Sequence, residues 1–118
     1  MAGQCVHADK TGTDAVTCRL AALDADLSAA GPTKLGGAAR AAALRARIGK
    51  AQSLVERSRS LNGKKSLKKL RGANKQMGVF VKLVKRGQSR SKIAAPLAEQ
   101  LLTLASDTAS RLQQLIPP

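Results

Sequence analysis

The fold is decided by residues 67–115, which read LKKLRGANKQMGVFVKLVKRGQSRSKIAAPLAEQLLTLASDTASRLQQL. Apolar residues recur here at intervals of three and four, as they do along the buried face of a helix. The pattern predicts a basic amphipathic helix over about 65–86 and a leucine-rich, nearly uncharged helix over about 95–116. The polar residues 88–92 separate the two, so the stretch is expected to form a helical hairpin.

The buried faces of this hairpin follow from the spacing. On the first helix they comprise Leu67, Leu70, Ala73, Met77, Phe80, Val81 and Val84, and on the second Leu97, Leu101, Leu104, Thr108, Leu112 and Leu115. Gly87 is expected to be the C′ residue that ends the first helix, since glycine is common there. Ile93 is expected to enter the core, and Pro96 suits the first turn of the second helix. Gly72 and Gly78 inside the first helix indicate close helix contacts or a small kink.

Two further helices are predicted upstream, over about 14–30 and 35–61. Val16, Leu20, Leu23 and Leu27 form the inner face of one, and Ala41, Leu44, Ile48, Ala51 and Val55 that of the other. Thr13 and Thr33 are the expected N-caps. Gly31 and Pro32 end the earlier helix, and Gly36 and Gly37 favour a later start, near Ala38, for its successor.

Composition supports an all-helical chain. The sequence has 118 residues, no Trp, no Tyr and one Phe, so its core must consist of aliphatic residues and alanine, and alanine favours helix. Residues 1–12 read as an irregular lead-in. We therefore predict one all-α domain over residues 1–118, a four-helix bundle that is antiparallel because its connections are short.

Positive charge is concentrated in the middle of the chain. The net charge is +14, yet residues 34–92 hold 18 basic residues against Glu56 alone. Such a field attracts polyanions such as nucleic acid or acidic polysaccharide; the alternative is a surface that only keeps the protein soluble. Arg40, Arg47, Lys50, Arg57 and Arg59 are expected to be solvated. The candidate polyanion-binding residues are Lys64, Lys65, Lys68, Lys69, Arg71, Lys75, Lys82, Lys85, Arg86, Arg90 and Lys92.

Cys5 and Cys18 are the only cysteines. A disulfide between them would pin the lead-in to the first helix and stabilise by about 3 kcal/mol in the chain-entropy model. Two free thiols in a reducing compartment are the first alternative. The second is a metal site with His7 and Asp9, but the spacing is not that of a zinc motif, so no metal is expected.

Catalysis and membrane insertion have little support. One histidine and seven scattered acidic residues form no acid–base pair, and no phosphate-binding glycine motif is present. We expect no enzyme activity and no cofactor. No apolar run reaches the ~20 residues of a membrane span, and the first residues lack the apolar core of a signal peptide. The chain is then either cytoplasmic or a domain of a larger protein.

A further pattern covers residues ~50–115: an aromatic and β-branched pair, a glycine-containing turn, an isoleucine and then a Leu/Ala-rich helix. It consists of Leu70, Ala73, Phe80, Val81, Val84, Gly87, Lys92, Ile93, Ala98, Leu101, Leu102 and Ala105. This pattern resembles the FIMAH domain, a small helical module appended to larger secreted bacterial and archaeal proteins. The resemblance implies an accessory or adhesive role, and a Cys5–Cys18 disulfide would fit that secreted setting.

The sequence thus favours a non-catalytic accessory module of a secreted or cell-surface protein. It would bind an acidic polysaccharide or a similar polymer through the basic faces of the helices at 35–61 and 65–86. One alternative is an intracellular protein that contacts the phosphate backbone of nucleic acid, and another is a purely structural domain. Free thiols in protein made under oxidising conditions would argue against the secreted setting.

Overall fold

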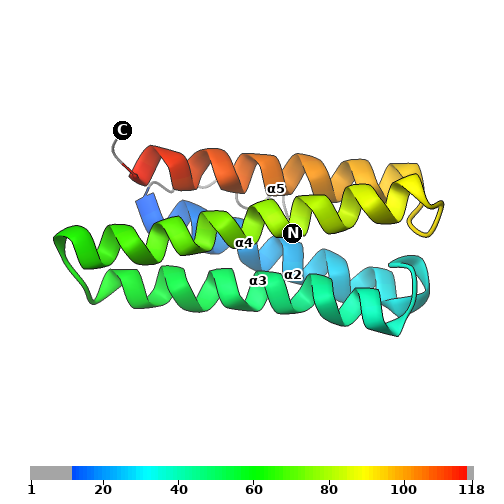
Figure 1. Ribbon diagram of the computed structural model, residues 1–118, viewed down its shortest axis with the longest axis horizontal. Coiled ribbons are helices and arrows are strands. Elements are labelled where there is room, and N and C mark those ends of the chain that lie inside the picture. The colour runs from blue at the N-terminus through cyan, green and yellow to red at the C-terminus, as the bar shows by residue number, and fades with distance from the viewer. Residues whose placement is uncertain (1–11, 117–118) are drawn as a thin grey trace.

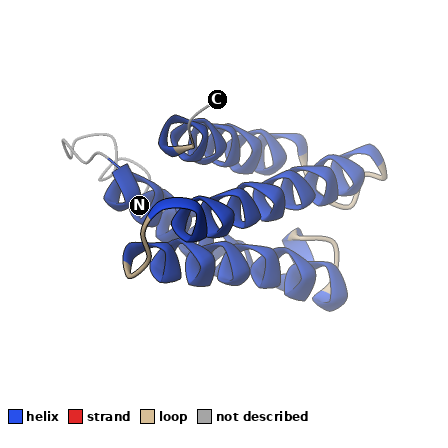
Figure 2. Ribbon diagram, turned by 60° about the vertical axis from the view of Figure 1, so that its left-hand side comes forward, coloured by secondary structure: helices blue, strands red, loops and turns tan. Residues whose placement is uncertain are grey.

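The computed structural model describes residues 12–116, and these form four α-helices with no strand among them. The helices are α2 (Gly12–Lys34), α3 (Ala38–Arg59), α4 (Gly63–Ser89) and α5 (Ala95–Leu115). They lie side by side along a rod of 42 × 27 × 22 Å (Figures 1 and 2). This arrangement confirms the predicted all-α four-helix bundle.

Each helix packs against two others. α3 contacts α2 and α4, while α5 contacts α4 and α2. The α2–α3 and α4–α5 turns lie at one end of the rod and the α3–α4 turn at the other (Figure 1). Consecutive helices are therefore antiparallel, and α2 and α4 occupy diagonal positions.

The core is aliphatic around one aromatic ring, that of Phe80, which is fully buried. All the predicted inner positions of the two upstream helices are buried. In α4 and α5 the inner residues are also buried, except Leu67, Val81, Leu97 and Leu115, which are partly buried. Ile93 is 1% exposed, so the loop isoleucine does enter the core as predicted.

The upstream boundaries differ from the prediction in their caps. Helical geometry breaks at Gly31 (φ 77°) as expected, but Pro32 starts one further turn that ends at Lys34. Thr13 and Thr33 lie inside α2 and do not act as N-caps. α3 begins at Ala38 because Gly36 and Gly37 both have positive φ, and its N-cap, Gly37, has no side-chain cap bond.

Gly87 is not the C′ residue of α4, and that prediction is wrong. The helix continues to Ser89, and Gly87 is buried within it. A Cβ atom at Gly87 would lie 2.6 Å from Cδ1 of Ile93. Glycine is needed there because Ile93 packs directly on the helix backbone. The close contact expected for the helix glycines exists at Gly72, where a Cβ atom would lie 3.2 Å from Leu54 Cδ1. It does not exist at Gly78, where a Cβ atom would meet nothing within 4 Å.

The true C′ residue of α4 is Ser91. Its φ is 58°, and the turn has the two hydrogen bonds of a Schellman motif: Lys92 N–H donates to the Gly87 carbonyl at 2.8 Å and Ser91 N–H to the Gln88 carbonyl at 3.0 Å. The α2–α3 turn has the same pair of bonds, with Gly36 at C′. The two turns at this end of the bundle thus share one geometry. The α4–α5 turn has serine at C′, where glycine is favoured.

Replacing Ser91 by glycine is expected to stabilise the protein by about 0.5–1 kcal/mol. The left-handed conformation costs a non-glycine residue roughly 1–2 kcal/mol, and the greater freedom of glycine in the unfolded chain offsets part of the gain. Urea unfolding measures the change. Gly36→Ala is the control of opposite sign, because its Cβ would lie 2.7 Å from Arg40 Nη1 at φ +88°. A loss of stability in Ser91→Gly would contradict this interpretation.

Candidate polyanion-binding surface

α4 carries the highest density of positive charge in the structure. Its 27 residues include nine lysines and arginines and no acidic residue. Six of these cations lie within about 60° of one another at ~100° per residue, directly opposite the buried face. We call this row the crest of α4; it consists of Lys64, Lys68, Arg71, Lys75, Lys82 and Arg86. From Lys64 to Arg86 it extends for about 33 Å along the helix.

The crest is exposed along its whole length. The remaining candidates lie around it: Lys65 and Lys69 on the side that faces α3, Lys85 on the side that faces α5, and Arg90 and Lys92 in the α4–α5 turn. Of the eleven candidate residues only Lys69 is partly buried. The structure therefore places these cations along one edge of the bundle and leaves their charged groups accessible.

This arrangement of charge works against the stability of α4. Like charges four residues apart repel on a helix surface, at about 0.2–0.5 kcal/mol for each pair. α4 has four such pairs: Lys64 with Lys68, Lys65 with Lys69, Arg71 with Lys75, and Lys82 with Arg86. Its first turn contains lysines and no acid, although the positive end of the helix dipole favours an acid there. Stability alone does not explain such a sequence.

Four of the nine other cations in residues 12–116 are in ion pairs. Arg45 lies 3.8 Å from Asp24, and Arg59 donates to Asp14 at 2.8 Å. Arg19 and Arg111 both approach Asp107. All four pair with acids on α2 or α5, apart from one further contact of Arg59 with Glu56 on its own helix. Within residues 12–116 no ion pair involves any candidate cation.

α3 adds a second row of cations beside α4. The sequence predicts that the basic face of this helix takes part in binding, but none of its cations is among the eleven candidate residues. Lys50 and Arg57 are exposed, whereas Arg40 and Arg47 are partly buried, so the expectation that all four are solvated is only partly right. Lys50 and Arg57 line a shallow groove with Ser53, Leu54 and Gln76. Helical spacing alone places Lys50 and Arg57 on the same side of α3 as Leu54. The sequence does not show that this side faces α4 near Gln76, because that depends on the α3–α4 register.

Three contacts define that register. Arg47 Nη1 donates to Gln76 Oε1 at 3.0 Å, and Ser66 Oγ donates to the Ser58 carbonyl at 3.1 Å. Between these, Leu54 packs over Gly72. Since the helices are antiparallel, Arg57 lies opposite residues 67–69. The groove therefore lies between the cations Lys50 and Arg57 of α3 and Gln76 of α4.

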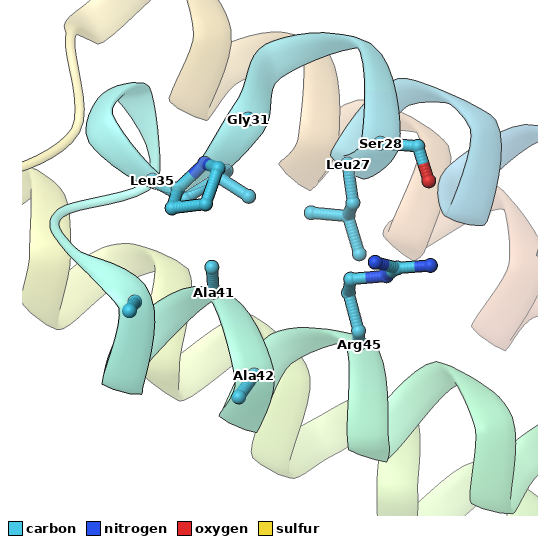
Figure 3. A pocket seen from close by; sticks show the side chains of 9 residues that line it. Leu27, Ser28, Gly31, Leu35, Ala41, Ala42 and Arg45 are labelled. Carbon is cyan, nitrogen blue, oxygen red and sulfur yellow. The ribbon is translucent and has the colours of Figure 1, made fainter.

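A second pocket lies between the kinked end of α2 and the first turns of α3 (Figure 3). Its walls are apolar, with Leu27, Leu35 and Ala41 among them, and Arg45 lies beside Leu27 at the edge. Because Arg45 already faces Asp24, this pocket offers no unpaired charged group. We do not include it in the candidate surface.

The structure describes only one residue of the predicted Cys5–Cys18 disulfide. Cys18 is partly buried on α2 and packs against the core, while Cys5, His7 and Asp9 lie outside the described residues. Within residues 12–116 no three metal-ligating side chains come together, and none of the helices there is long and apolar enough to cross a membrane.

Comparison with known proteins adds no assignment: no protein family, curated protein or solved structure matches this chain. The resemblance to the FIMAH domain therefore stays a prediction.

Proposed function

We propose that this protein is a non-catalytic binding module that holds an acidic polymer against the α3–α4 face. The observation that carries the proposal is that the ion pairs of the described residues lie away from the crest of α4. The cations with carboxylate partners are four arginines whose acids lie mainly on α2 and α5: Arg19, Arg45, Arg59 and Arg111. The crest of α4 and the neighbouring cations Lys50 and Arg57 have no such partner in the described structure. A face of unpaired cations that also weakens its own helix is best explained by an external anionic partner.

The expected mode of binding is electrostatic contact with repeated anionic groups. The only phenylalanine is buried and the chain has no Trp or Tyr, so the aromatic platforms on which single-stranded bases stack are not available. The crest also lacks Asn and Gln, which read base edges. A sulfated or carboxylated polysaccharide is the leading partner. The phosphate backbone of a duplex nucleic acid offers similar chemistry and is the alternative.

The setting we propose is that of an accessory module in a secreted or cell-surface protein. It rests on the FIMAH resemblance and on the predicted Cys5–Cys18 disulfide. A cytoplasmic location remains the alternative and would accompany free thiols and a nucleic-acid partner.

Titration with heparin and with a duplex DNA across a range of salt concentrations tests the proposal. Engagement of ~5 phosphates on DNA predicts a log–log salt slope near −4 to −5. Tighter binding of heparin at matched salt would favour a polysaccharide, and tighter binding of DNA the alternative. If neither polymer binds at low salt, the charge serves only solubility and the proposal is wrong.

A further inference from the structure

The groove between α3 and α4 differs from the crest because it contains neutral hydrogen-bonding groups among its cations. Ser53 and Gln76 line it together with Lys50, Leu54 and Arg57. Leu54 packs directly on Gly72, so no side chain of α4 stands between Leu54 and Gln76 at that position. The groove is therefore open, and it has positive charge on its α3 side.

The orientation of the Gln76 amide is determined by Arg47. A guanidinium group only donates hydrogen bonds, so the atom that faces Arg47 Nη1 at 3.0 Å must be the amide oxygen. The amide nitrogen of Gln76 then takes the other position and is left with two N–H groups to donate. Since Gln76 is part of the groove lining, these groups are available to an acceptor in the groove.

Arg47 shows that glutamine is not the most stable choice at position 76. Its Nε is buried and has no hydrogen-bond partner in the described structure. A glutamate at position 76 would accept from Arg47 Nη1 in a charge-assisted hydrogen bond, which is stronger than the bond to a neutral amide oxygen. The neutral amide gives Arg47 only a neutral partner. It keeps the groove free of negative charge and supplies a donor.

We infer that this groove seats the anionic groups of the acidic polymer. Lys50 and Arg57 would provide charge, and the Gln76 amide and the Ser53 hydroxyl would donate hydrogen bonds. The ligand group is a tetrahedral oxyanion, a sulfate or phosphate ester, because such a group accepts several hydrogen bonds at once. This inference rests on the proposed function and adds to it a defined point of contact, with Arg47 as a positioning residue.

Gln76→Glu separates the two roles of the groove. The variant is expected to melt at a higher temperature than the wild type, because Arg47 gains a carboxylate partner, and to bind heparin about 5- to 10-fold more weakly at low salt. Gln113→Glu is the matched control: it makes the same change of charge at an exposed position on α5 and should lower affinity by less than about 2-fold. Thermal melting and heparin titration, with duplex DNA as the phosphate probe, give both readouts.

A second pair of variants tests the cations on α3. Arg57→Gln should weaken binding by about 3-fold or more, whereas Arg45→Gln, the same substitution on the side of α3 that faces α2, should change it little. If each groove variant lost no more affinity than its control (Arg57→Gln against Arg45→Gln, Gln76→Glu against Gln113→Glu), the groove assignment would be wrong. The proposed function would still stand, because the wild type binds the polymer. If the wild type binds neither polymer, both are overturned.

Discussion

Replacing Asp107 by alanine is expected to destabilise the bundle by about 2–4 kcal/mol. Asp107 on α5 is the carboxylate partner of Arg19 on α2, and the side chain of Arg19 is only 5% exposed. Removing one member of a buried pair leaves an uncompensated charge, which typically costs about 3–5 kcal/mol. We place the expected loss somewhat lower because Asp107 is 42% exposed, so water can approach Arg19 from that side. Urea unfolding measures the change.

Arg19→Met is the counterpart and should behave very differently. Methionine has an apolar chain of similar length and can fill the space between α2 and α5, while Asp107 keeps Arg111 as a neighbour and contact with solvent. Replacing a buried charge with an apolar residue is often close to neutral, so a change within about 1 kcal/mol is expected. If Arg19→Met destabilised the protein as much as Asp107→Ala, the ion pair itself would be the source of stability.

The core positions of the bundle could be predicted because they depend on one helix at a time. Apolar residues at intervals of three and four specify the buried face of each helix whatever its neighbours are. Leu44, Ile48 and Val55 are buried for this reason, as are Leu101 and Leu112. Short connections then leave an antiparallel bundle as the simple arrangement.

The caps and the groove could not be predicted because they depend on how elements meet. Gly87 fits the pattern of a helix end, yet it lies inside α4 because Ile93 packs on it. Arg19 lies three residues after Val16 and four before Leu23, so helical spacing places it beside the buried stripe, but its pairing with Asp107 depends on the position of α5. The partnership of Lys50 and Arg57 with Gln76 depends in the same way on the α3–α4 register. Charge on α4 was visible in the sequence, but the absence of partners in the described structure was not.

Replacing Lys64, Lys65, Lys68 and Lys69 together by glutamine is expected to weaken binding of acidic polymers by about 10- to 100-fold at low salt. Each exposed contact contributes up to about 1 kcal/mol, and each lost phosphate contact lowers the DNA salt slope by about 1. The same substitutions should leave the protein at least as stable as the wild type. They remove two like-charge pairs and the lysines at the positive end of the α4 dipole. Salt-dependent titration and thermal melting measure the two effects.

The matched control places the same change of net charge on the exposed face of α5, away from the α3–α4 face. Thr103, Ser106, Ser110 and Gln113 are exposed on α5, and changing all four to glutamate lowers the net charge by the same four units. If the α4 cations contact the polymer, this control should retain most of its affinity and its salt slope. Equal losses in the two variants would mean that binding follows net charge alone. A loss confined to the α4 variant, without a loss of stability, would show that its cations are retained for binding and not for folding.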